Sequence, residues 1–348
     1  MIEQKTSQGG GQGPPRLPVG PARPRLPIVG ASKELGIFVL LLVLCIFVTI
    51  MSHGTFVHVD NLQNTSQLIG LYGIFSIGLG IVIITGGIDL SVGSLFALLG
   101  VILSIMLTEW HWPWPLAVIG ILAGGALIGL FHGFLITRVN LQPFIVTLCG
   151  LLFYRGIARF IANDGTMGFG ESHGFETLKT LATGSVLGVP VPFVLLLVTA
   201  AVMGVVLHRS VYGRYLYAVG RNEEAARYSG VNSRRIIAGA YVISGLLAGL
   251  AAILIAFYTN SISPSTHGQS YELYGIAAAV LGGCSLRGGE GSIVGILIGA
   301  ALLQVLQNLV NLLGIPSSLN FAVVGAVILL GVITDEVIKR RNAGKIKV

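Results

Sequence analysis

The chain has 348 residues, of which 53% are hydrophobic and only 10% are charged. This composition excludes an ordinary soluble domain and is typical of an integral membrane protein. The net charge of +7 comes from Lys and Arg gathered in loops and tails, so it requires no nucleic-acid partner. The three cysteines (Cys45, Cys149 and Cys284) are far apart and lack metal-ligand spacing. We therefore predict an all-α protein that is embedded in the lipid bilayer.

Residues 1–34 hold six of the 13 prolines and no apolar period, so we expect a disordered cytoplasmic tail. About 20 apolar residues cross a bilayer, and we predict ten spans. They lie at roughly 35–52, 61–84, 90–108, 114–137, 142–162, 191–208, 236–258, 271–286, 291–313 and 318–335. The eighth span is short and Gly-rich. These spans define a transmembrane domain over 35–335, followed by a basic cytoplasmic tail at 336–348.

The distribution of basic residues orients these spans. With the N-terminus inside and ten crossings, 18 of the 21 Lys and Arg residues lie on the inner side. Cytoplasmic segments carry such an excess, so the pattern favours an N-in, C-in topology. Arg155 and Arg159 then fall near the outer end of the fifth span, where we expect them to reach toward the outer interface or to line an outer vestibule.

The chain contains an internal repeat at an offset of 202 positions. The sequence L-Y-G-I occurs at 71–74 and again at 273–276, and 11 of 25 ungapped positions agree over 71–95 and 273–297. Both copies contain a Gly-Gly pair, at 86–87 and 288–289. Internal repeats are typical of transporters, and in this topology the two copies run in the same direction.

The stretch Arg209–Arg235 is a polar segment between long apolar spans. It holds six arginines, at positions 209, 214, 221, 227, 234 and 235. Asn222 is placed to cap a short helix with Glu223 and Glu224 in its first turn, and Gly230 is placed to end it. The segment is either an ordinary positive-inside loop or a docking helix for a cytosolic partner.

A glycine-rich motif joins the second and third spans. Gly86, Gly87 and Gly93 allow tight turns, and Asp89 or Ser91 is placed to cap the next helix. Asp89 is the only acid in or between these two spans. An acid near the membrane indicates function, whereas the alternative is a simple helix cap in a cytoplasmic turn.

Four amides mark the ninth span. Gln304, Gln307, Asn308 and Asn311 lie at i, i+3, i+4 and i+7, on one face of a helix. Amides donate and accept hydrogen bonds, which suits a polyhydroxyl solute. This face either lines a translocation path or joins helices by hydrogen bonds.

Glycines at four-residue spacing predict close helix packing in two places. They are Gly125, Gly129 and Gly133 in the fourth span, and Gly291, Gly295 and Gly299 in the ninth.

The sequence shows no G-x4-G-K-[ST] loop, nucleophile, paired acids or metal cluster, so we expect neither an enzyme nor a metal site.

Three separated motifs resemble one family. G-G-I-D-L-S-V-G-S (86–94), V-G-R-N-E-E-A-A-R-Y-S-G-V-N (219–232) and G-G-x-G-S-I-x-G (288–295) are similar to the permease subunit of bacterial ABC importers for monosaccharides. This branch is typified by ribose, xylose, arabinose, galactose and autoinducer-2 permeases. The resemblance covers about residues 35–335, and the long Pro/Gly-rich tail departs from it.

The resemblance implies a ten-helix, BtuC-like importer bundle in the bacterial inner membrane. It implies a second permease copy or paralogue, a cytosolic ATP-binding-cassette ATPase and a periplasmic sugar-binding protein as partners. The ATPase would hold ATP and Mg, and this chain would need no cofactor. The segment that matches the coupling helix, which docks on the ATPase, holds Arg221, Asn222, Glu223, Glu224, Ala225, Arg227, Gly230 and Val231.

Two functions of other classes remain as alternatives. In an ion-gradient-driven secondary sugar transporter, Asp89 would be the coupling acid. A passive channel or scaffold would need no coupling helix.

Overall fold

A computed structural model describes residues 28–170 and 174–316, together with single positions between 319 and 329. In these ranges the α-helices are α1 (Ile28–Met51), α2 (Val59–Ile84), α3 (Val92–Thr108), α4 (Trp114–Thr137), α5 (Pro143–Ile161), α6 (Glu176–Thr183), α7 (Val191–His208), α8 (Val211–Arg221), α9 (Glu223–Tyr228), α10 (Ser233–Thr259), α11 (Tyr271–Leu281) and α12 (Ile293–Leu312). A 3-10 turn, η1 (Thr55–Val57), precedes α2.

Four two-residue strands complete the described elements. β1 (Met167–Gly168) pairs antiparallel with β4 (Ser261–Ile262), and β2 (Ser185–Val186) pairs with β3 (Val189–Pro190). They connect helix ends and form no sheet core.

The first nine predicted spans each contain a helix. Seven described helices are long and apolar enough to cross a membrane: α1, α2, α4, α5, α7, α10 and α12. The helices α3 and α11 are apolar but shorter. The tenth predicted span and the tail at 336–348 lie almost wholly outside the described residues.

The prediction of a tail over residues 1–34 is wrong at its end, because α1 begins at Ile28. Pro27 is the last proline of that region, and the following stretch to Met51 contains none, so nothing in it interrupts a helix. Residues 1–27 lie outside the described part of the chain.

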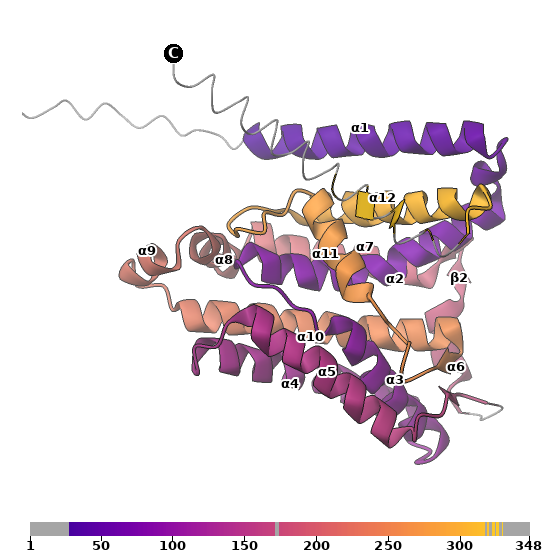
Figure 1. The fold of residues 1–348 in the computed structure, drawn as a ribbon, viewed down its shortest axis with the longest axis horizontal. Helices are drawn as coiled ribbons and strands as arrows, with labels where there is room; N and C mark the ends of the chain where they lie inside the picture. The colour runs from indigo at the N-terminus through magenta and orange to yellow at the C-terminus, as the bar shows by residue number, and fades with distance from the viewer. Residues whose placement is uncertain are drawn as a thin grey trace, which may run out of the picture.

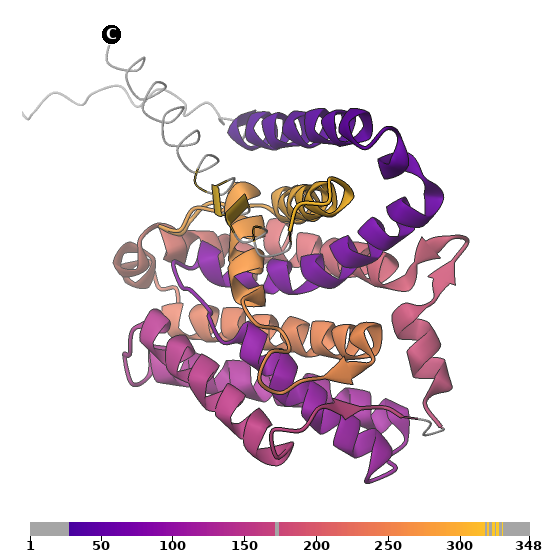
Figure 2. The same ribbon diagram turned by 45° about the vertical axis from the view of Figure 1, so that its right-hand side comes forward.

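The helices form a bundle around α2 and α10, which are the most buried of the long helices (Figure 1). On one side of α10 lie α3, α4 and α5, and on the other side lie α2, α7 and α12 (Figure 2). Helix α1 lies on the outside, packed along α12 (Figure 2). The short helices α8 and α9 project at one end, opposite α6 and the β2–β3 hairpin (Figure 1).

Glycines set the closest helix contacts, as their spacing predicted. A methyl group on Gly129 would lie 2.1 Å from the carbonyl oxygen of Tyr241, which brings α4 directly against α10. A methyl group on Gly299 would lie 2.1 Å from the carbonyl oxygen of Ala278, which brings α12 against α11. The prediction is wrong for Gly291, which lies in the turn before α12 rather than on the helix.

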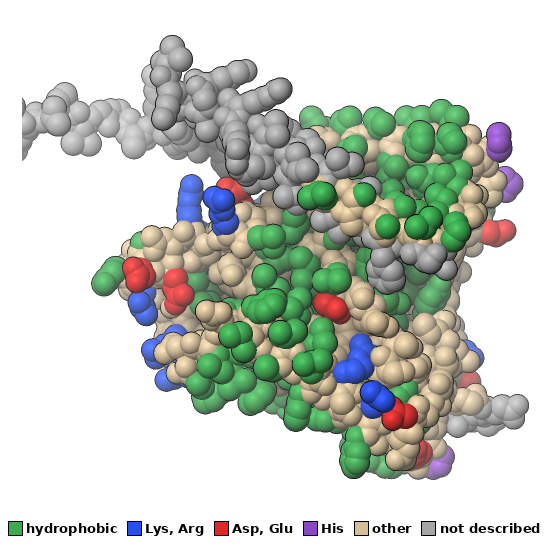
Figure 3. Space-filling model, viewed as in Figure 1, with side chains coloured by type: hydrophobic (Ala, Val, Ile, Leu, Met, Phe, Trp, Pro, Cys, Tyr) green, Lys and Arg blue, Asp and Glu red, His purple; other side chains and the backbone are tan. Residues whose placement is uncertain are grey.

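Charged side chains gather at the end that carries α8 and α9 and in a second group toward the opposite end, whereas apolar side chains cover much of the face between them (Figure 3). An apolar face of this kind is expected where lipid or another protein surrounds a bundle.

Candidate functional site

The short helix α9 is the predicted capped helix. Its N-cap Asn222 accepts a 2.9 Å hydrogen bond from the amide of Ala225. At the other end, Gly230 has φ +84° and its amide donates to the carbonyl of Arg227 at 3.0 Å. The amide of Val231 donates to the carbonyl of Ala226 at 3.0 Å, so the helix ends in a Schellman motif. The predicted start, end and caps of this helix are confirmed.

Helix α9 exposes nearly all of its surface. Of residues 221–230, only Ala226 is buried. Tyr228 is 90% exposed, and sequence reasoning did not single it out. The Glu223 side chain bonds to the bundle, because Ser233 at the start of α10 donates a 2.9 Å hydrogen bond to its carboxylate. The face of α9 that is open to a partner therefore centres on Glu224, Arg227 and Tyr228.

Helix α8 anchors this projection, and the sequence analysis missed it. Its N-cap Ser210 accepts from the amide of Gly213, and Leu216 and Val219 are buried against the bundle. The hydroxyl of Tyr217 donates to the carbonyl of Gly291 at 2.7 Å, and burial raises its pKa, so it stays protonated. The sequence evidence for α8 is the apolar i, i+3 pair of Leu216 and Val219. It is weak because the glycines in the segment lower its helix propensity.

Asp89 lies inside the bundle and is only 2% exposed. Its Oδ1 accepts hydrogen bonds from the amide and hydroxyl of Ser91, at 3.0 and 2.7 Å. Its Oδ2 accepts from the hydroxyl of Ser244, in the middle of α10, at 3.0 Å. Of the two alternatives for Asp89, the simple helix cap in a turn does not fit this burial.

The predicted helix cap in this motif is also wrong. Ser91 is the N-cap of α3, but its hydroxyl donates to Asp89 and makes no cap hydrogen bond. Asp89 instead closes a local turn and fixes the non-helical segment 85–91 to α10. The buried pair of His132 and Tyr154, 2.8 Å apart, belongs to the helices beside this segment. Among the described residues, no group of three or more His, Cys, Asp or Glu side chains is arranged to hold a metal ion.

The internal repeat brings its own equivalent residues together. The rings of Tyr72 and Tyr274, which occupy the same position in L-Y-G-I, meet edge to face with centroids 6.0 Å apart. The two Gly-Gly turns also meet, because the amide of Gly289 donates to the carbonyl of Ile84 at 2.8 Å. The two copies are thus neighbours in space.

The four amides of α12 differ in their surroundings. Asn308 is buried and exchanges two hydrogen bonds with Asn61 of α2, at 2.8 and 3.2 Å. This pairing is the interhelical bonding that one alternative predicted. Gln304 is 2% exposed, and its Oε1 has no hydrogen-bond partner among the described residues. Gln307 is half-buried and Asn311 is exposed.

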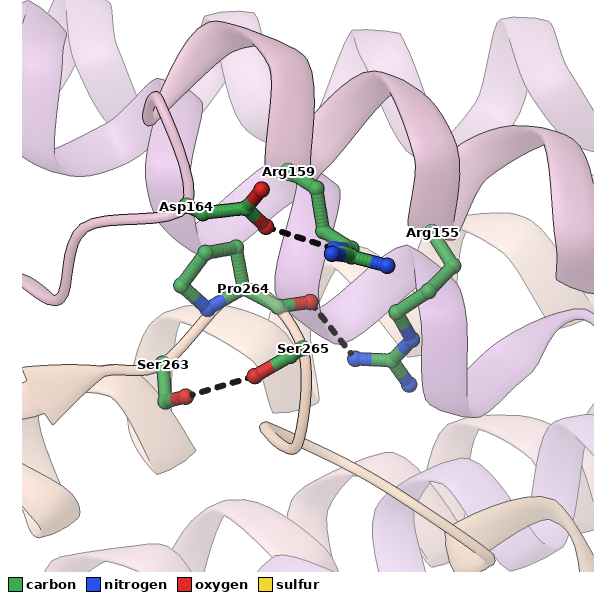
Figure 4. A network of polar contacts seen from close by, with 6 residues as sticks. All are labelled: Arg155, Arg159, Asp164, Ser263, Pro264 and Ser265. Atoms are coloured by element: carbon green, nitrogen blue, oxygen red, sulfur yellow. Dashed lines mark hydrogen bonds and ion pairs between the residues drawn. The ribbon is translucent and has the colours of Figure 1, made fainter.

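Arg155 is held by backbone carbonyls within the fold. Its guanidinium donates to the carbonyls of Pro264, His267 and Gly93, at 3.2, 2.6 and 3.2 Å (Figure 4 shows the bond to Pro264). It joins α5 to the start of α3 and to the loop before α11, and neither expected role, at the outer interface or in an outer vestibule, included these contacts.

Arg159 binds a carboxylate, whereas Arg155 binds backbone carbonyls. It forms an exposed 2.6 Å ion pair with Asp164, which lowers the pKa of that carboxyl group (Figure 4).

The chain is similar to known permease proteins over most of its length. A profile for the family described as "Branched-chain amino acid transport system / permease component" matches residues 61–332. The ribose import permease protein RbsC of Escherichia coli strain K12 is 41% identical, over 85% of this chain and 91% of the relative. RbsC of Bacillus subtilis strain 168 is 38% identical, over 87% and 92%.

The xylose transport system permease protein XylH of Escherichia coli strain K12 is 32% identical, over 89% of this chain and 94% of the relative. No solved structure matches the chain significantly. Because the profile spans most of the chain and the relatives align over nearly their whole lengths, the chain belongs to this family of transport-system permease components, which confirms the resemblance drawn from its three motifs.

Proposed function

We propose that this chain is the membrane permease of an ATP-binding-cassette importer and that it carries a monosaccharide across the bacterial inner membrane. The observation that carries the proposal is α9, a short helix capped at both ends and exposed on nearly all sides. A helix of this kind suits docking on a cytosolic ATPase. The relatives are ribose and xylose permeases, which makes a pentose the first cargo to test.

The ATPase docks on α9 in this proposal. The exposed face of α9 presents a carboxylate, a guanidinium and an aromatic ring, from Glu224, Arg227 and Tyr228. These groups suit a partner cleft with a polar rim and an apolar centre. Arg221, Asn222, Glu223, Ala225, Gly230 and Val231 hold the helix in shape or flank it. ATP and Mg belong to the ATPase, and this chain performs no catalysis.

The proposed topology has ten spans with both termini in the cytoplasm, in a BtuC-like bundle. The support is that α8 and α9 lie at the end opposite α6 and the β2–β3 hairpin (Figure 1), and that this end carries the arginine-rich segment. A sugar-binding protein then docks at the α6 end. A second permease copy or a paralogue completes the channel, and the segments before α1 and at 336–348 lie in the cytoplasm.

The sugar path is proposed along the amide face of α12. Gln304 is the strongest candidate, because its buried Oε1 is free to accept a hydrogen bond from a sugar hydroxyl. Gln307 and Asn311 extend the same face, whereas Asn308 also holds Asn61. Gly86, Gly87, Asp89, Ser91 and Gly93 form the turn around which α2 and α3 are expected to move.

Copurification with the cognate ATPase, followed by ATP-driven uptake, tests the proposal. The double variant Glu224→Lys plus Gly230→Asp reverses one charge and places a side chain at φ +84°. We expect this variant to lose both ATPase binding and uptake. Unchanged uptake would contradict the docking role of α9.

A further inference from the structure

Three segments that are distant in the sequence meet at one point behind α9. They are the end of α8, the turn after α2 and the turn before α12. A methyl group on Gly220 would lie 1.8 Å from the carbonyl oxygen of Ile84 and 2.6 Å from the amide nitrogen of Gly289. The three backbones are therefore in direct contact, with no side chain between them.

The contact is reciprocal. A methyl group on Gly288 would lie 2.7 Å from the carbonyl oxygen of Gly220 and 2.9 Å from the amide nitrogen of Gly86. Gly288 and Gly86 have φ of +81° and +83°, which any other residue adopts only with strain. Each of the three segments thus supplies a glycine to one junction.

A side-chain bond adds to this junction. Tyr217, one turn before Gly220 on α8, donates its hydroxyl to the carbonyl of Gly291 at 2.7 Å. Its ring also stacks against His208 at the end of α7, with centroids 6.5 Å apart. Helix α8 is therefore fixed to the turn before α12 by a hydrogen bond and to the turn after α2 by backbone contact.

Each of the two glycine turns lies where the helical structure of the bundle is interrupted. The turn after α2 belongs to the non-helical segment 85–91, which Asp89 fixes to Ser244 of α10. The turn before α12 separates α11, the shortest apolar helix of the core, from α12. In membrane transporters, non-helical segments at membrane depth line binding sites between the repeats, and the repeats rock around those sites.

We propose that Gly220 and Tyr217 are positioning residues that transmit movement of α9 to both glycine turns at once, so that one docking event drives both copies of the internal repeat. This inference rests on the proposed function, since α9 must move with an ATPase. Backbone contact suits this role, because packed backbones transmit displacement with little loss to side-chain rotation.

The test compares variants in proteoliposomes that hold the permease, its ATPase and its binding protein. Gly220→Ala forces α8 away from the turns, and Tyr217→Phe removes only the hydroxyl. The matched controls are Gly204→Ala, on α7 with open space around it, and Tyr215→Phe, an exposed tyrosine of the same helix. The readouts are ATPase copurification, ATP hydrolysis, and sugar molecules imported per ATP hydrolysed.

We expect Gly220→Ala and Tyr217→Phe to bind the ATPase and hydrolyse ATP, while the import-to-hydrolysis ratio falls by about twofold to thirtyfold, the range for residues on a coupling network. Both controls should keep the wild-type ratio. Equal ratios in Tyr217→Phe and wild type would overturn the inference even if Gly220→Ala failed to fold. Failure of the wild type to bind the ATPase would instead overturn the proposed function.

Discussion

The amide of Gly289 donates a 2.8 Å hydrogen bond to the carbonyl oxygen of Ile84, and this bond joins the two copies of the internal repeat. Ile84 ends α2, and Gly289 lies in the turn before α12. The bond closes a junction at the base of the charged helices α8 and α9.

The caps of α9 should control ATPase affinity. Asn222→Ala removes the acceptor of the Ala225 amide, and loss of such a cap costs about 1 kcal/mol. A helix of six residues has little else to stabilise it, so we expect weaker ATPase binding in nanodiscs, measured by titration.

Asn232→Ala is the matched control for this prediction. Asn232 caps α10, whose 27 residues are packed in the core. ATPase affinity should stay near the wild-type value, and an equal loss in both variants would argue against a specific role for α9.

The bond between Ser244 and Asp89 should stabilise the bundle. Ser244→Ala leaves a buried carboxylate with one donor fewer, which costs about 1–3 kcal/mol. We expect a lower Tm in detergent. Ser76→Ala is the control, because the buried Ser76 hydroxyl bonds only to its own helix, at Tyr72. A Tm of Ser244→Ala equal to that of Ser76→Ala would contradict the role assigned to Asp89 in fixing segment 85–91.

The pair of Asn61 and Asn308 should behave as an interhelical contact. Asn61→Leu leaves the Asn308 amide without the two bonds to Asn61, whereas Asn308→Leu leaves the Asn61 amide with its 2.9 Å bond to the carbonyl of Phe56. The double variant removes both amides. Interhelical bonds of this kind contribute roughly 0.6–2 kcal/mol. A double-mutant cycle on unfolding free energy should show this coupling, and additive effects would contradict it. Uptake by the double variant then measures any separate contribution of Asn308 to the sugar path.

Arg155 should hold the loop before α11 in place. Arg155→Ala removes the three hydrogen bonds that the guanidinium donates, so three backbone carbonyls lose their donor. We therefore expect a clear fall in Tm and faster proteolysis near Pro264. Arg159→Ala is the control, since its ion pair with Asp164 is exposed and should matter little. Equal stability of the two variants would refute the structural role of Arg155.

The sequence predicted what depends on local pattern and hydropathy. Seven of the predicted spans contain helices long and apolar enough to cross a membrane, and they were found because long apolar stretches leave few alternatives. The caps at Asn222 and Gly230 were found because helix ends use few residue types. Helix α8 was missed because Gly213 and Gly220 lower its intrinsic propensity, and burial of Leu216 stabilises it instead.

Long-range partners could not be predicted in this way. The His267 carbonyl that Arg155 binds lies 112 positions away in the sequence, and the Ser244 hydroxyl that Asp89 binds lies 155 positions away. Hydropathy places a glycine-rich motif between two spans, but it does not show that the chain turns back into the bundle there. The repeat at Tyr72 and Tyr274 was visible, yet only the fold shows that the two rings meet.

Uptake into proteoliposomes distinguishes an ATP-driven importer from an ion-driven transporter. Vesicles would hold the full-length permease, its ATPase and its binding protein, and a panel of labelled pentoses and hexoses would be supplied with ATP. The account predicts uptake of one or a few monosaccharides that requires all three proteins and stops without ATP hydrolysis. Uptake by the permease alone, driven by a proton or sodium gradient, would contradict the account and direct attention to Asp89.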